Sequence, residues 1–286
     1  MESTIESYWE YSDPAGSEDR FKQALESASG DYRLELLTQI ARTYSLRKRY
    51  EEAHQLLDEI EHLLNEAGNR PNLRYLLERG RTYNSSGDKE RARDLFIRAW
   101  QLGTETNEIG LAVDAAHMVA ITFAGSELAI DWNLKGLEIA RPSVDAKARS
   151  LIPAMLNNSA WDLHDMGRYD QALPLFEDAL TEWVAREKPT QIQIAKWSVA
   201  RCLRSLKRHE DALAIQRELE AEHANLGTKD GYVFEEIAEN LQALDRKQEA
   251  RPYFSRAYDE LRKDKWLVEN EGPRLESLKI RVGRFG

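Results

Sequence analysis

Six alanines recur along the chain at almost regular distances, and this recurrence limits the possible folds more than any other feature. Successive members are 39, 37, 43, 40 and 38 residues apart: Ala53, Ala92, Ala129, Ala172, Ala212 and Ala250. Each lies in a segment whose apolar residues are three or four positions apart, which is the period of a helix. Helical units that recur with such a period are typical of repeat proteins, in which each unit packs on its neighbours.

The segment 155–184 shows one such unit in full. Its apolar and small residues form two helical stripes, Met155, Leu156, Ser159, Ala160 and Leu163 in the first and Ala172, Leu175, Phe176 and Ala179 in the second. Gly167 lies between them and predicts a helix end, because only glycine adopts left-handed backbone angles at little cost. The segment therefore predicts two antiparallel helices joined by a tight turn at Gly167 and Arg168.

Small residues also recur in the first helix of each unit. Two antiparallel helices approach to about 8–10 Å only where a small side chain lies at their crossing. The first helices supply Ala41, Gly80, Ala160, Ala200 and Ala238, and the second helices supply the recurring alanines. We therefore assign these residues to packing, and expect a bulky side chain at Ala172 to cost about 1–3 kcal/mol.

This unit resembles the tetratricopeptide repeat. The matching residues are Gly167, Tyr169, Ala172, Phe176 and Ala179, while Leu156 and Leu163 stand where that family usually has Trp and Tyr. The units are longer than the usual repeat of about 34 residues. With the run from Leu156 to Ala160, they are most similar to the repeats of kinesin light chains and their bacterial relatives.

The resemblance covers residues 34–260 and implies the architecture. It predicts an all-α, right-handed superhelical solenoid of about six helix-turn-helix repeats with capping helices at both ends. We expect a single domain spanning residues 1–286, divided into an N-terminal cap (1–33), six repeats (34–263) and a C-terminal capping segment (264–286). Tyr8, Trp9 and Tyr11 precede a break at Pro14 and are expected to cover the first repeat, since terminal repeats are atypical.

Composition excludes several classes of function. The chain has 40 Lys and Arg against 50 Asp and Glu, a net charge of −10, which argues against a general binder of nucleic acid or anionic membranes. Its one cysteine, Cys202, cannot form an intramolecular disulfide. The N-terminal residues resemble no secretory signal, and no stretch of eighteen apolar residues occurs, so we expect a cytoplasmic protein.

The sequence contains no motif that indicates catalysis or a cofactor. It has neither a glycine-rich phosphate loop nor an H-E-x-x-H pair, and no two of its six histidines are three or four residues apart. We therefore predict no enzyme activity, no catalytic residue, no bound metal and no cofactor.

Candidate binding residues lie on the first helices, which line the concave surface in this repeat class. Opposite the packing stripe, at spacing i, i+4, i+7, the sequence places a set rich in arginine, tryptophan and asparagine: Arg42, Arg81, Asn84, Asn157, Asn158, Trp161, His164, Trp197, Arg201 and Arg204. Tryptophan and arginine are enriched where proteins bind one another, and an asparagine amide pairs with a peptide backbone in both directions. We predict that these residues form a ligand-binding groove.

The predicted function is a non-enzymatic scaffold that binds a protein or peptide segment, with the arginines neutralising acidic side chains or a terminal carboxylate. Two alternatives stay open: a bacterial peptide-sensing regulatory receptor, whose usual N-terminal effector domain exceeds the 33 residues before the first repeat, and a self-associating structural adaptor. A simpler interpretation also stays open, in which the tryptophans are partly buried and the arginines pair with carboxylates. The sequence predicts no nucleic-acid or membrane partner and leaves the oligomeric state unknown.

Overall fold

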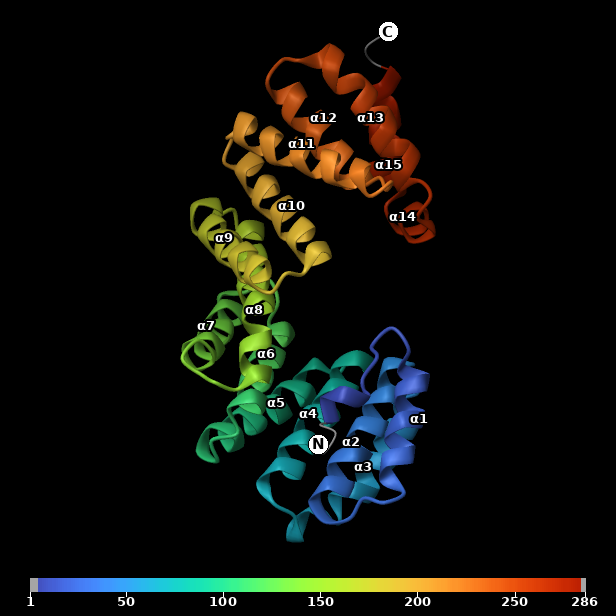
Figure 1. Ribbon diagram of the computed structural model, residues 1–286, viewed down its shortest axis with the longest axis vertical. Coiled ribbons are helices and arrows are strands. Elements are labelled where there is room, and N and C mark those ends of the chain that lie inside the picture. Colours follow the sequence, from blue (N-terminus) through green and yellow to red (C-terminus); the bar gives the residue numbers. More distant parts are fainter. Residues whose placement is uncertain (1–4, 284–286) are drawn as a thin grey trace. The chain divides into compact units, whose positions relative to one another are not determined.

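The computed structural model describes residues 5–283, which are helical with no strand among them, and this confirms the predicted all-α fold (Figure 1). The chain divides into two compact units, Met1–Met155 and Leu156–Gly286. The boundary lies within helix α8 (Ala146–Asp165).

The first unit holds the helices that precede α8. Its elements are η1 (Ile5–Tyr8), α1 (Pro14–Leu25), α2 (Gly30–Leu46), α3 (Tyr50–Glu61), η2 (Leu64–Glu66), α4 (Asn69–Ser86), α5 (Lys89–Glu105), α6 (Ile109–Thr122) and α7 (Glu127–Ala140). The second unit continues with α9 (Tyr169–Ala185), α10 (Pro189–Ser205), α11 (His209–Asn225), α12 (Gly231–Ala243), α13 (Lys247–Leu261), α14 (Lys265–Asn270) and α15 (Gly272–Gly283).

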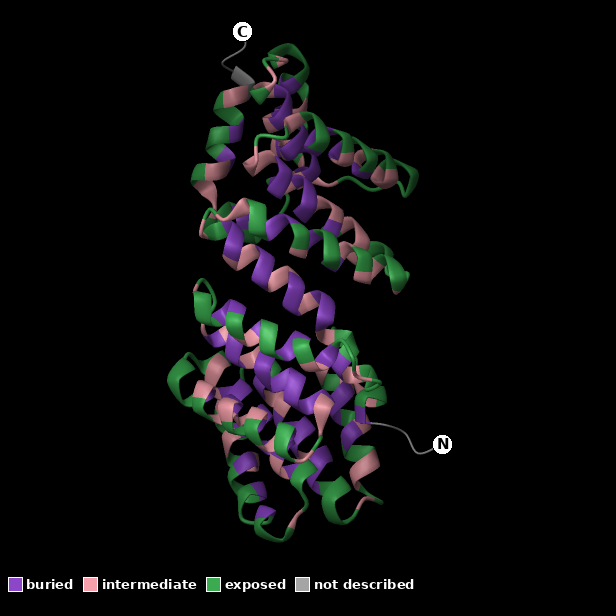
Figure 2. Cartoon of the chain, turned by 90° about the vertical axis from the view of Figure 1, so that its left-hand side faces the viewer, coloured by how far each residue is buried: buried purple, intermediate pink, exposed green. Residues whose placement is uncertain are grey.

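The helices pair into the hairpins that the repeat predicts. The pairs are α2–α3, α4–α5, α6–α7, α8–α9, α10–α11 and α12–α13, and each second helix carries one of the recurring alanines, all of them buried. The extensive helix contacts recorded within residues 5–283 join helices one or two places apart along the chain. Figure 2 shows buried residues alternating with exposed ones along the helices, as expected where each helix turns one side to its neighbours.

A residue with positive φ lies at the turn of each hairpin. These residues are Lys48, Gly87, Gly125, Gly167, Lys207 and Asp245, and they recur with the period of the alanines. At Gly167, where φ is +76°, the amide donates to the carbonyl of His164 (2.9 Å), and the amide of Arg168 donates to that of Leu163 (2.9 Å). These two bonds satisfy carbonyl groups of the last turn of α8, and they form because Gly167 adopts left-handed backbone angles. They confirm the predicted helix end.

Close packing explains why small residues recur on the first helices. A Cβ atom added to Gly80 on α4 would lie 2.5 Å from Cε1 of Phe96 on α5. Phe96 is fully buried, so its ring has no free space into which it could move. Glycine at position 80 is therefore needed for the approach of α4 and α5.

Both ends of the array carry extra helices. Near the N-terminus, Ile5 and Phe21 form a buried cluster with Leu36 and Ile40 of α2, and the Trp9 ring meets the Phe21 ring edge-on at 5.1 Å. Near the C-terminus, α15 packs on α13, and the core there includes Leu275 and Leu278 of α15. The predicted C-terminal capping segment extends to residues 284–286, which lie outside the described residues.

Candidate functional site

The candidate groove residues divide between the two units. Arg42, Arg81 and Asn84 belong to the first unit, and the remaining seven belong to the second. In both units they lie on the first helix of a hairpin, as predicted.

The two candidate arginines of the first unit are paired with buried carboxylates. Arg81 on α4 donates to Oε1 of Glu78 (2.8 Å) and pairs with Asp114 on α6. Nη1 of Arg42 on α2 lies 3.3 Å from the same Oε1. Burial raises the pKa of Glu78, but the charges of Arg81 and Arg42 outweigh it, so this pKa lies below its usual value. These ion pairs join α2, α4 and α6 to one another.

Burial on this face is deeper than the sequence pattern suggests. Arg81 is only 9% exposed, because α4 contacts α2 and α6 as well as its own hairpin partner. Asn84 is half-buried, and its Oδ1 has no hydrogen-bond partner among the described residues. The first-helix face of this unit is thus largely an interface between helices.

The second unit carries a row of aromatic side chains across three successive first helices. The rings of Trp161 on α8 and Trp197 on α10 are 6.1 Å apart, and the Trp197 ring is 6.3 Å from that of Tyr232 on α12. All three side chains are partly exposed. We call Trp161, Trp197 and Tyr232 the aromatic row. Its first two members bring α8 and α10 together on this face.

Two arginines beside the aromatic row share one glutamate. Arg204 binds Glu236 on α12 through two bonds of 2.7 and 2.9 Å, whereas Nε of Arg201 lies 3.4 Å from Oε1 of the same carboxylate. Arg201 also donates to the hydroxyl of Ser205 (2.6 Å). Burial and the charge of Arg204 together lower the pKa of Arg201, and the two guanidinium charges here face one carboxylate.

Neighbouring groups do not remove this surplus of positive charge. The next glutamates on α12, Glu235 and Glu239, are paired with Arg274 and Arg281 of α15. His164 is buried, with Nε2 3.0 Å from the Ser205 hydroxyl, and burial together with the charge of Arg201 lowers the pKa of its ring. Arg201 and Arg204 therefore share one carboxylate, an arrangement that suits an anionic ligand.

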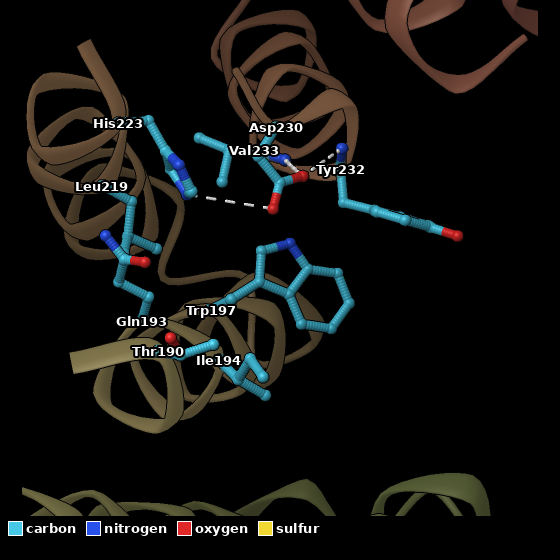
Figure 3. Close-up of a pocket in the computed structure, with 9 residues that line it drawn as sticks. All are labelled: Thr190, Gln193, Ile194, Trp197, Leu219, His223, Asp230, Tyr232 and Val233. Carbon is cyan, nitrogen blue, oxygen red and sulfur yellow. Dashed lines mark hydrogen bonds and ion pairs between the residues drawn. The ribbon is translucent and has the colours of Figure 1, made fainter. Parts of the chain in front are cut away.

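Next to Trp197 the surface is hollowed. The hollow has a volume of 420 Å³ and lies between α10, α11 and α12 (Figure 3), lined by Thr190, Gln193, Ile194, Trp197, Leu219, His223, Asp230, Tyr232 and Val233. Leu219 and Val233 are buried, whereas Ile194 is 59% exposed. In Figure 3, His223 and Asp230 lie across the hollow from the residues of α10, with Nε2 3.9 Å from Oδ2. Such a mostly apolar concavity suits an apolar side chain.

The second unit also holds two candidate asparagines and the single cysteine. Asn157 and Asn158 are half-buried on α8, on the turn before Trp161. Cys202 is buried, its thiol donates to the carbonyl of Tyr169 (3.5 Å), and burial raises its pKa to about 11. A thiol with this pKa is almost wholly protonated at neutral pH, so it is a poor nucleophile.

Sequence reasoning missed Glu236, Tyr232 and the hollow. Trp161, Trp197 and Tyr232 lie 11, 15 and 18 residues before Ala172, Ala212 and Ala250, so the aromatic row crosses the repeats diagonally. The positions i, i+4 and i+7 lie 15, 11 and 8 residues before each alanine, so the sequence pattern includes both tryptophans but not Tyr232. Within residues 5–283 no group of histidine, cysteine and carboxylate side chains could hold a metal ion, and no helix is long and apolar enough to cross a membrane.

A family model described as tetratricopeptide repeat matches residues 33–60 and 154–185. These segments correspond to most of the hairpins α2–α3 and α8–α9. The match confirms the resemblance seen in the sequence. A search of curated proteins finds no significant match.

Solved structures share the fold at low sequence identity. A signal transduction ATPase with a tetratricopeptide repeat sensor from Pyrococcus horikoshii is similar with a TM-score of 0.75 at 12% identity, over 93% of this chain, and this chain spans 41% of its length. A putative kinesin light chain from Podosopora anserina is similar with a TM-score of 0.57 at 17% identity. The match covers 70% of this chain and 99% of that one. NprR in complex with its cognate peptide NprX is similar with a TM-score of 0.52 at 17% identity. The match covers 96% of this chain and 81% of that one. Identities this low show the fold alone.

Proposed function

The chain is built of tetratricopeptide-like repeats, and from this we propose that it is a non-enzymatic module that binds a protein or peptide segment. The segment lies on the first-helix face of the second unit. The observation that carries the proposal is the partly exposed aromatic row beside Arg201, an arginine that shares its carboxylate partner with Arg204. Aromatic and arginine side chains in this arrangement are typical of protein interaction sites.

The finer part of the proposal is that the segment bears a carboxylate. Arg201 has the weaker hold on Glu236, at 3.4 Å against 2.7 Å for Arg204, so it is the group free to turn toward a ligand. A side-chain or terminal carboxylate would supply the missing negative charge, and hydrogen bonds to charged groups contribute about 1.5–3 kcal/mol. The segment is therefore acidic or ends in its own carboxylate.

Apolar contacts would hold the rest of the segment. One apolar side chain of the ligand enters the hollow against Trp197 and Leu219, while Asn157 and Asn158 hydrogen-bond its backbone beside Trp161. Arg42 and Arg81 belong to the first unit and take no part in this site; their ion pairs join the first helices of that unit.

The structural likeness to NprR in complex with its cognate peptide favours one more specific function. In that complex a protein of similar fold binds its cognate peptide. The second candidate is therefore a peptide-sensing regulatory receptor, in which the bound segment is a free signalling peptide rather than part of a partner protein.

The test is selection from a displayed library of random twelve-residue peptides with free C-terminal carboxylates, using the full chain. We expect selected peptides to combine a carboxylate near one end with a large apolar residue. Arg201→Gln and Trp197→Ala should each weaken their binding more than tenfold. Arg208→Gln is the matched control, because Arg208 is an exposed arginine that pairs only locally with Asp211 (2.8 Å).

Selection of no peptide above background would count against the proposal. Equal losses from Arg201→Gln and the Arg208→Gln control would remove the assigned site. Selection of apolar peptides without a carboxylate would leave the binding function but refute its acidic specificity.

A further inference from the structure

The N-terminal segment of the chain lies against the first-helix face of the first unit. Residues 5–11 include one carboxylate and three aromatic side chains that make contacts outside their own segment. Ile5 is buried in the cluster around Phe21, whereas Glu6 and Tyr11 are exposed. The segment thus has an anchored side and a side that contacts polar residues of α2 and α4.

Those contacts are specific and come from three side chains. Oε1 of Glu6 lies 2.9 Å from Nη2 of Arg74 on α4. The Trp9 indole donates to Oε1 of Gln39 on α2 (3.0 Å). The Arg42 guanidinium lies 5.4 Å from the centroids of both the Trp9 and the Tyr11 ring, which stack on each other at 4.9 Å. Cation–π contacts of this kind add to the hydrogen bonds.

Charge complementarity links the segment to this face. The ion pairs here connect five cations, Arg42, Arg70, Arg74, Arg81 and Lys147, with five carboxylates, Glu6, Glu35, Glu78, Glu108 and Asp114. Glu6 is the one carboxylate of this set that the N-terminal segment supplies. Without it, Arg74 and Arg70 share Glu35, and Arg74 is nearly inaccessible to solvent. A buried arginine that loses a carboxylate is costly, so the face favours an acidic side chain at this place.

The contact made by Glu6 leaves room for another chain. Glu6 lines a hollow of 500 Å³ together with Arg70, Glu108, Lys147 and residues at the start of α6 and α8. Its side chain is 48% exposed, and that of Tyr11 is exposed as well. Glu6 is therefore accessible to a competing carboxylate, which can take its place without leaving Arg74 short of a partner.

We propose that this face of the first unit is a second segment-binding site, separate from the one in the second unit. Its ligand is an acidic residue followed by two aromatic ones in the spacing Glu-x-x-Trp-x-Tyr, as in residues 6–11. The chain's own N-terminal segment fills the site in cis. A partner segment of the same chemistry binds when it displaces Glu6, Trp9 and Tyr11 from Arg74, Gln39 and Arg42.

The test uses the full chain with Glu6→Gln, Trp9→Ala and Tyr11→Ala together, which leaves Ile5 and Tyr8 in the core. The probe is a fluorescent synthetic peptide with the sequence of residues 1–13, followed by anisotropy. We expect the triple variant to bind it at least tenfold more tightly than the unaltered chain. Adding Arg42→Gln and Arg74→Gln to the triple variant should abolish the gain.

Matched controls separate specific exchange from a loosened fold. Glu10→Gln changes a neighbouring exposed carboxylate that touches neither α2 nor α4 in any recorded contact, and should leave peptide binding unchanged. If the triple variant unfolds, the same peptide binding is measured with Glu6→Gln alone, because this half-exposed side chain can be changed with little packing loss. Its expected gain is about threefold. A folded variant that fails to bind the peptide would show that the segment is a structural cap only.

Discussion

Glu236 holds two guanidinium groups, and the two differ in what they can still bind. Arg204 meets it through a two-bond fork, which is the strongest arrangement for this pair of groups. Arg201 approaches the same carboxylate from a longer distance and divides its donors between Glu236 and Ser205. Arg204 is therefore mainly a structural link from α10 to α12, and Arg201 is the better ligand contact.

This difference predicts unequal effects on stability. Arg204→Gln leaves Glu236, which is 4% exposed, with only the weaker partner, so we expect a loss of about 1–3 kcal/mol in the free energy of unfolding. Arg201→Gln should cost less than about 1 kcal/mol. Urea denaturation of both variants measures the difference. Equal losses would contradict the assignment, and charge reversal at position 204 should be still more damaging because it places two carboxylates together.

At the scale of the helix pair, close packing decides the effect of substituting glycine. Gly80→Ala should gain about 1 kcal/mol from helix propensity, but the new methyl would lie 2.5 Å from the fully buried Phe96 ring. Overpacking costs about 1–3 kcal/mol, which exceeds that gain, so we expect a net loss of stability. Thermal unfolding checks this, with Ser85→Ala on the exposed side of the same helix as control. A higher melting temperature for Gly80→Ala than for the unaltered chain would disprove it.

Hairpins were predictable from the sequence because their determinants are local. Ala172 at the helix crossing and Gly167 at the turn follow from spacing and backbone preference alone. The contacts between first helices were not predictable, since Glu236 lies 32 residues after Arg204 and no helical period relates them. Arg81 was expected on an exposed face but is buried, because the pattern of one helix does not show how closely the next first helix approaches. That the ten candidate residues bind a ligand stays a prediction.

Over the whole molecule, contacts between near neighbours predict that damage stays local. Leu278 of α15 is buried in the core that includes Phe254 of α13. Leu278→Asp should therefore speed amide hydrogen exchange in α12 and α13 and leave α2 to α5 unchanged. Ser277→Asp, on the exposed side of α15, is the control. Uniform acceleration along the chain would show that the repeats unfold as one cooperative block.

Protonation gives a second prediction for the whole chain. Burial lowers the pKa of His117 and His164 below the ordinary 6.5, so the folded protein binds these protons less readily than the unfolded chain. The stability that the fold draws from keeping these histidines neutral is therefore fully present above pH 6.5. It is lost as the pH falls below that value. The slope is at most about 1.4 kcal/mol per pH unit for each histidine. Urea midpoints at pH 7.5 and 5.5 measure it. Replacing both histidines by Gln should reduce the dependence, and His54, whose pKa burial also lowers, should supply part of what remains.

The contacts between near neighbours also bear on how the chain is made. Since the extensive contacts recorded within residues 5–283 join helices one or two places apart, a hairpin needs little of the later sequence before it can pack. Chains rich in local contacts fold quickly, and protein synthesis releases the N-terminal part first. The first hairpins can therefore close while the ribosome is still translating the rest. Each later hairpin would then pack on a preceding hairpin that is already folded, so little apolar surface would stay exposed in the nascent chain.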